Sequence, residues 1–235
     1  MTGTTADETR RDLTALADEI ATDAGARGGV YALAASAFDQ PSETFYRELA
    51  AGRVDDQFAA LIDRCGLDVE PPDTTVTEDR ETVAARFNDL FVVGYSEVID
   101  KTDGTVENHG PPVSLYESDY RSEVSWNDVN LDLARAYEYF GCQVDRETRR
   151  NHDHVRLQLE FMGYLCRREA AVDRSVAGAR LDFHDRHLRV VTEGIADALG
   201  EEPGTGLYGR LAEFLDRFTA ADVDDLAARR AGESP

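Results

Sequence analysis

The spacing of apolar residues constrains the fold of this chain more than any other feature. Apolar side chains recur at intervals of three and four residues, as from Leu13 through Leu16 and Ala17 to Ile20. That interval brings them to one face of an α-helix, whereas a half-buried strand needs strict alternation. We find no segment with convincing alternation. The sequence therefore predicts an all-α fold, a single globular bundle of about nine to ten helices.

Capping residues and glycines predict where these helices begin and end. Ser42 and Thr77 are expected N-caps, since a hydroxyl can accept a hydrogen bond from a free amide in the first turn. Gly66 follows an apolar run and predicts a helix end. The helices expected from periodicity include those over residues 6–24, 30–38, 179–199 and 206–218. The tail after Thr219 is acidic and is expected to fray.

Residues 95–115 interrupt the helical pattern. They contain Gly104, the run Gly110-Pro111-Pro112 and mixed polar residues, so we expect the longest irregular segment of the chain here. This connection divides a single domain, residues 1–235, into an N-terminal half, 1–94, and a C-terminal half, 116–220, before an acidic tail, 221–235. A long connection can act as a hinge for helix exchange, so the expected state is a monomer or a domain-swapped dimer.

The charge of the chain excludes some partners. The formal net charge is -22, and Lys101 is the only lysine among 25 basic residues. Because no basic stripe is present to neutralise phosphates, we expect no binding of nucleic acid. A dense carboxylate coat with almost no lysine is typical of halophilic archaea, whose cytosol contains molar salt. At 1 M salt the Debye length is about 3 Å, so only short-range charge contacts would act.

The N-terminal residues and the cysteines indicate a cytoplasmic protein. The N-terminal residues lack the apolar run of an export signal, and no stretch is long enough to span a bilayer, so we expect no stable membrane insertion. Cys65, Cys142 and Cys166 lack the spacing of a metal or redox pair. They are expected to be free thiols in a reducing compartment.

Enzymatic motifs are weak in this sequence. It has neither a Gly-x-Ser-x-Gly elbow nor a phosphate-binding loop, and we expect no catalytic residues and no cofactor. One alternative from another class stays open, a metal-dependent helical enzyme. Its ligands would be His152, His154, His184 and His187, which could converge on one ion. No Glu-x-x-His pair of the kind used by di-iron bundles is present, and we expect no metal.

Two segments predict a site for a peptide. In the loop over residues 110–118, two prolines hold the backbone extended and Tyr116 presents a ring with a polar tip. Asp153 and His154 open an amphipathic helix, where free amides favour an acidic residue. Loop and helix would form the walls of a peptide groove. The candidate residues are Ser114, Tyr116, Glu117, Asp119, Trp126, Asp153, His154, Leu157, Glu160 and Phe161.

The order of these motifs, over roughly residues 25–220, resembles the TorD/DmsD family of redox-enzyme maturation chaperones. The resemblance rests on their sequence and spacing together. The segments that carry it are residues 31–38, Pro41 with residues 45–49, residues 87–92 leading into 111–116, Asp153-His154 with Leu157, residues 159–162 and Leu165, and residues 183–188 followed by 207–212.

The resemblance implies a cytoplasmic chaperone for a molybdenum-cofactor reductase. Its partners would be the twin-arginine signal peptide and the apo catalytic subunit of a dimethylsulfoxide or trimethylamine N-oxide type reductase, held until cofactor insertion and export. Carboxylates could pair with the guanidinium groups and apolar side chains could take the rest of the peptide. A nitrate-reductase-type assembly chaperone is the alternative within the same fold. The residues proposed for these contacts are Glu117, Asp119 and Asp153, and Tyr116, Leu157 and Phe161.

Overall fold

The structure is a computed structural model that describes residues 22–100, 105–144, 151–171 and 176–232. A helix over residues 22–37 comes first. The expected helix over residues 6–24 lies almost wholly outside the described residues. The elements that follow are α2 (Glu43–Ala50), α3 (Arg53–Cys65), α4 (Arg80–Phe91), β1 (Ser96–Asp100), β2 (Thr105–Asn108), η1 (Glu117–Tyr120), α5 (Trp126–Tyr139), α6 (Val155–Ala171), α7 (Val176–Phe183), η3 (His184–Leu188), α8 (Arg189–Glu201) and α9 (Leu207–Gly232).

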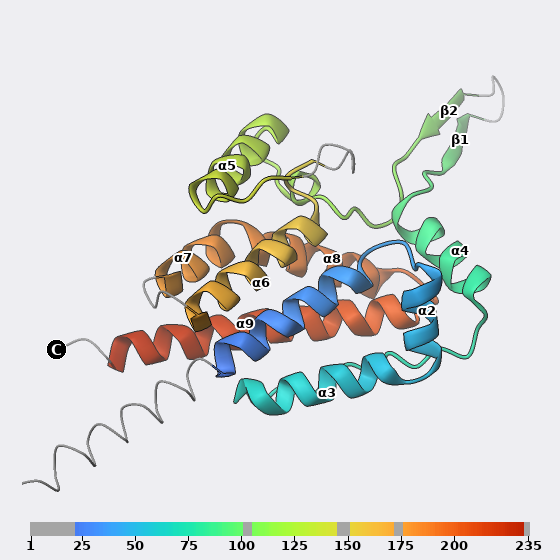
Figure 1. Cartoon of the computed structure of the whole chain (residues 1–235). Helices are drawn as coiled ribbons and strands as arrows, with labels where there is room; N and C mark the ends of the chain where they lie inside the picture. The colour runs from blue at the N-terminus through green and yellow to red at the C-terminus, as the bar shows by residue number, and fades with distance from the viewer. Residues whose placement is uncertain (1–21, 101–104, 145–150, 172–175, 233–235) are drawn as a thin grey trace, which may run out of the picture.

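The all-α prediction is confirmed. Among the described residues there are eight continuous helices, slightly fewer than expected, since the expected helix over residues 6–24 lies almost wholly outside them. Elements α7, η3 and α8 run on without a break, where one helix over residues 179–199 was expected. Helix 22–37 and α9 form the centre of the bundle, with α3 on one side and α6 and α8 on the other, while α5 lies at the top (Figure 1). Gly28 and Gly163 allow helix 22–37 to cross α6 closely, since a Cβ on either would lie 3.0 Å from the other's carbonyl oxygen.

One of the two predicted N-caps is confirmed and the other is wrong. Ser42 caps α2 as predicted, and its side chain accepts a hydrogen bond from the Phe45 amide. The prediction for Thr77 is wrong, because Asp79 caps α4 and accepts from the Thr82 amide. The Thr77 hydroxyl instead lies 3.2 Å from the Glu78 carboxylate.

The segment expected to be irregular contains a β-hairpin. Strands β1 and β2 pair antiparallel, with an irregularity between Val98 and Asp100, and the hairpin projects away from the bundle (Figure 1). The expectation that the chain has no strand is therefore wrong at this point. Both strands are short, so the hairpin leaves the helical class of the fold unchanged.

The expectation of a fraying tail after Thr219 is also wrong. Helix α9 continues to Gly232 and buries Asp222, Val223 and Leu226. The carboxylate of Asp222 is fully buried and receives hydrogen bonds from Arg27 (2.9 Å), Arg180 (2.6 Å) and the Tyr31 hydroxyl (2.7 Å).

Burial raises the pKa of Asp222, but the two guanidinium groups outweigh it and hold the pKa below its usual value. Glu169 and Asp225 extend the cluster, since they pair with Arg180 and Arg27 respectively. This ion cluster joins helix 22–37, α7 and α9 through the middle of the bundle. Among the described residues, no helix is long and apolar enough to cross a membrane.

Candidate functional site

The loop and the helix that were expected to form the site meet edge to edge. The Val155 amide donates to the Leu115 carbonyl (2.8 Å) and the Glu117 amide donates to the Asp153 carbonyl (3.0 Å). Tyr116 and His154 thereby form an isolated antiparallel bridge. Leu115 and Val155 are buried on either side of it. The start of α6 is thus fixed by the backbone of the loop that precedes η1.

Tyr116 and His154 form an aromatic pair at this bridge. Their rings pack edge to face, with centroids 5.0 Å apart at 89°. The Arg156 amide donates to Nδ1 of His154 at 3.1 Å, so the neutral ring carries its proton on Nε2. Tyr116 is half-buried and His154 is buried. The pair is the part of the predicted site that reaches from the interior toward the surface.

Asp153 lies inside the protein and not at an open helix start. One carboxylate oxygen accepts from the amide (3.2 Å) and the hydroxyl (2.6 Å) of Ser118, so the side chain caps η1. The other oxygen, Oδ1, is buried and has no hydrogen-bond partner among the described residues. The carboxylate is enclosed, and a guanidinium from outside has no direct path to it in this structure.

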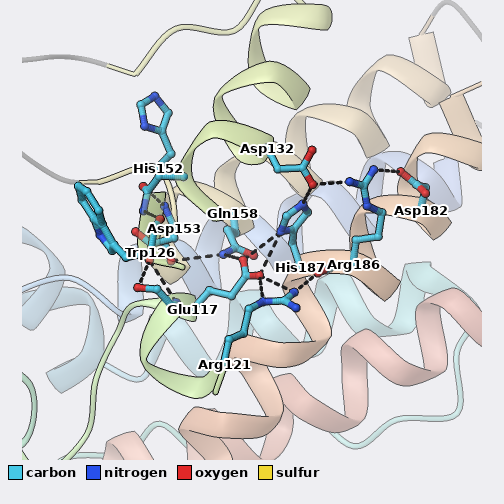
Figure 2. A network of polar contacts seen from close by, with 12 residues as sticks. Glu117, Arg121, Trp126, Asp132, His152, Asp153, Gln158, Asp182, Arg186 and His187 are labelled. Carbon is cyan, nitrogen blue, oxygen red and sulfur yellow. Dashed lines mark hydrogen bonds and ion pairs between the residues drawn. The ribbon is translucent and has the colours of Figure 1, made fainter. Parts of the chain in front are cut away.

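Glu117 is the centre of a buried polar network (Figure 2). Its carboxylate is fully buried and accepts from Arg121 (2.6 Å), Gln158 (2.8 Å) and His187 (3.1 Å). These donors come from the end of η1, from α6 and from η3. Glu117 therefore fastens three elements together at the site, and like Asp153 it is occupied by internal partners.

His187 extends this network to α5. Its Nε2 lies 3.2 Å from the Asp132 carboxylate, while its Nδ1 faces Glu117. Each ring nitrogen thus faces a carboxylate oxygen, and only the charged ring donates to both. Arg186 also pairs with Asp132 and with Asp182. The π-helical turn η3 carries both residues, and such turns often occur at functional sites.

The four histidines are not gathered into a metal site. No group of three or more His, Cys, Asp or Glu residues in the described parts of the chain could hold a metal ion. His152 lies beside the Tyr137 ring at 6.0 Å, and His184 is buried in η3, where burial lowers its pKa.

The remaining candidates divide between the surface and the core. Trp126 is the first residue of α5 and is 52% exposed. Asp119 is exposed and accepts a hydrogen bond from the Ser114 hydroxyl. Glu160 is exposed and pairs with Arg156 (2.8 Å), and Leu157 is half-buried.

Phe161 belongs to the core. It packs against Tyr137 and Phe183, each with ring centroids 4.8 Å away. It also lines a pocket between α5 and α7.

Sequence reasoning missed most of the partners of Glu117, among them Gln158 and His187. Gln158 was passed over, although it is a polar residue among the inward positions Val155, Leu159 and Met162 of α6. A polar residue on a buried stripe requires a hydrogen-bond partner, and that was the available signal. His187 was weighed only as a metal ligand, because its partners Glu117 and Asp132 lie 70 and 55 residues away.

A family model described as nitrate reductase delta subunit matches residues 52–190, more than half of the chain. The chain belongs to the nitrate reductase delta subunit family. This membership confirms the resemblance to TorD/DmsD-type maturation chaperones. The matched region contains the Tyr116–His154 bridge and the Glu117 network.

Curated proteins similar to this member of the delta subunit family are named as assembly chaperones. The selenate reductase assembly chaperone protein of Thauera selenatis is 37% identical over 82 residues, 32% of this chain and 42% of the relative. The chlorate reductase assembly chaperone protein of Ideonella dechloratans is 32% identical over 115 residues, 46% and 53% of the two chains. The perchlorate reductase assembly chaperone protein of Dechloromonas aromatica (strain RCB) is 24% identical over 122 residues, 49% and 54%. The chain spans about half the length of these relatives.

Proposed function

We propose that this protein is a non-catalytic assembly chaperone for the catalytic subunit of a molybdenum-cofactor reductase, acting in the cytoplasm. The observation that carries the proposal is the family match over residues 52–190, which spans the loop, α5, α6 and η3. The curated relatives are named assembly chaperones and not reductases. The buried network supports a binding role, because it holds a surface in place while its own carboxylates are already occupied.

The client that fits these relatives best is an oxyanion reductase. Their names specify selenate, chlorate and perchlorate reductases, and the family description specifies nitrate reductase. The assembly chaperone of a nitrate-type enzyme, the alternative in the sequence analysis, is thereby favoured over that of a dimethylsulfoxide or trimethylamine N-oxide type enzyme.

We propose that the peptide binds around Tyr116. Tyr116 offers a half-buried ring, Trp126 an exposed one, and Asp119 an exposed carboxylate. A twin-arginine peptide would place its guanidinium group at Asp119 and its apolar residues on the rings. Glu117 and Asp153 would act indirectly, because they hold the loop that presents Tyr116.

Calorimetric titration with a synthetic twin-arginine signal peptide tests this binding. The Asp119→Asn and Tyr116→Ala variants are each expected to weaken binding about 3- to 10-fold, in line with one exposed ion pair or one aromatic contact. Asp63→Asn on α3 is the matched control and should bind as the wild type does. Equal binding of a peptide with Lys-Lys in place of Arg-Arg and a broken apolar run would reject the signal-peptide proposal.

Affinity capture from a native high-salt lysate identifies the client. Recovery of the catalytic subunit of an oxyanion reductase is the expected result. Recovery of a dimethylsulfoxide-type reductase subunit would restore the other client class. Absence of any molybdenum-cofactor enzyme subunit from the captured proteins would contradict the chaperone proposal.

A further inference from the structure

A groove follows α5 along the side that faces the continuous helix of α7, η3 and α8. Two adjoining pockets, of about 310 and 510 Å³, form this groove. They share the lining residues Asp132, Arg135, Arg186 and His187. The ion pairs of Asp132 with Arg186 and His187, drawn in Figure 2, therefore join residues that line both pockets.

Bulky apolar side chains line the groove without being covered. On α5, Leu131 is 49% exposed and Tyr139 is 84% exposed. They lie one turn before and one turn after Arg135, so the three residues share one helix face. Phe140 and Phe183 line the smaller pocket beneath this face. The α5 face thus presents an apolar residue, a cation and an aromatic residue in a row.

The charge of the groove differs from that of the chain as a whole. Acidic residues outnumber basic ones in the sequence by 47 to 25, yet the larger pocket is lined by four arginines and three aspartates. Three of the arginines are engaged by carboxylates. Arg135 is exposed and forms no ion pair within the part of the chain that the structure describes. The lining arginines are Arg121, Arg135, Arg186 and Arg189.

We infer that this groove binds an acidic amphipathic segment of the client's catalytic subunit. A carboxylate of the segment pairs with Arg135, and flanking bulky apolar residues contact Leu131 and Tyr139. The exposed guanidinium group of Arg135, which forms no ion pair among the described residues, disfavours a basic peptide. The apolar residues beside Arg135 favour a protein segment over a phosphate group. None of residues 114–119 lines either pocket. Assignment of the segment to the client rests on the proposed function.

Fluorescence anisotropy with model peptides tests the charge preference of the groove. The probe is a labelled helical peptide with leucine and glutamate on one face, and its partner probe has lysine in place of each glutamate. At about 0.1 M salt the glutamate peptide is expected to bind at least about 10-fold more tightly. Equal binding of the two peptides would overturn the inference.

Variants of the α5 face locate the binding. Arg135→Glu is expected to weaken the glutamate peptide about 10-fold and to reverse the preference between the peptides, since attraction becomes repulsion. Leu131→Ser and Tyr139→Ser should weaken both peptides. Arg64→Glu makes the same change on α3, at the opposite side of the bundle (Figure 1), and should leave binding unchanged. Equal effects of Arg64→Glu and Arg135→Glu would place the binding elsewhere.

Two further measurements separate this inference from its alternatives. If sedimentation shows a dimer of the wild type that Arg135→Glu abolishes, the groove is a contact between two copies and the inference is overturned. Affinity capture with both proteins tests the client assignment. Capture of a reductase subunit by the wild type and weaker capture by Arg135→Glu supports the inference. Equal capture by both overturns it and leaves the proposed function standing, whereas capture by neither contradicts the proposed function.

Discussion

Glu117 shows how one buried residue can determine the shape of the site. Three donors from three different elements converge on its carboxylate, and no water-exposed surface remains on the residue. Removal of the carboxylate would take an acceptor from each of these donors. The cost of an unpaired buried charge exceeds the gain from forming the pair, so the network acts mainly to specify one arrangement of η1, α6 and η3.

We predict that Glu117→Gln lowers the free energy of unfolding by about 3 kcal/mol, the lower end of the range for breaking a buried ion pair. The amide keeps the size of the side chain but brings its own donors against Arg121 and His187. Urea denaturation measures the loss. Glu160→Gln is the matched control, because its ion pair with Arg156 is exposed, and it should cost no more than about 0.5 kcal/mol. Similar losses in both variants would contradict a special role for Glu117.

Asp222 gives the chain an acid-sensitive contact. Arg180 and Arg27 hold the pKa of Asp222 below its usual value in the folded state. A carboxylate with a depressed folded pKa contributes stability that is present above its unfolded pKa, near 3.9, and that is lost as the pH falls through the folded pKa. The other carboxylates complicate a simple measurement, since their protonation relieves repulsion in a chain of charge -22.

Comparison with Asp222→Asn isolates this contribution. We predict that wild type exceeds the variant in unfolding free energy at pH 6 and that the difference shrinks as the pH falls below about 4. Urea denaturation at each pH, with about 1 M salt to screen general repulsion, measures the difference. A difference that stays constant from pH 6 to pH 3 would show that Asp222 is not the titrating group.

At the scale of helices and strands, close packing depends on particular glycines. Gly194 and Gly200 both lie in α8. A Cβ at Gly194 would lie 2.4 Å from the ring of Tyr120, whereas nothing lies within 4 Å of a Cβ at Gly200. The Tyr120 hydroxyl also donates to the Ser114 carbonyl at 2.7 Å. The Tyr120 ring, which packs against Gly194, therefore supports the loop that carries the candidate site.

We predict opposite effects of alanine at these two positions. Gly194→Ala should destabilise the protein by about 1–3 kcal/mol, because the ring or the helix has to shift. Gly200→Ala should stabilise it by roughly 0.5–1 kcal/mol, since alanine loses less backbone entropy in a helix. Thermal unfolding followed by circular dichroism compares them. The packing argument fails if both substitutions change stability in the same direction.

The helices were predictable because their apolar residues repeat along the chain itself. The helix ends at Ser42 and Gly66 were predictable because a cap acts on residues within one helical turn of it. The hairpin was missed because β1 and β2 have only five and four residues, and the irregularity at Val98 breaks their alternation.

The tail was misjudged because its stability comes from distant partners. Asp222 is 195 residues from Arg27 and 42 from Arg180 along the chain, so its sequence neighbours suggest a solvated acidic helix. The same limit applies to the candidate site. The motifs placed Tyr116 near His154, but the burial of Glu117 and Asp153 depends on η3 and α5, which approach only in the folded protein.

For the whole molecule, the dominant quantity is the net charge of -22. Like charges spread over one bundle repel one another and destabilise the compact state. The buried ion clusters neutralise only their own charges and leave this surface repulsion in place. Salt reduces this repulsion, because the Debye length falls from about 10 Å at 0.1 M to about 3 Å at 1 M. Contacts such as the Asp222 cluster are shielded from solvent and should respond little to salt.

We predict that the melting temperature rises steeply with potassium chloride between about 0.1 and 1 M and more gradually above that, because screening is then nearly complete. Differential scanning calorimetry over this range provides the measurement. Sucrose at matched osmolality is the control, since it strengthens burial by exclusion and does not screen charge. A melting temperature that rises equally in sucrose would assign the effect to exclusion, and one that does not rise in salt would mean that the acidic surface carries little repulsive strain.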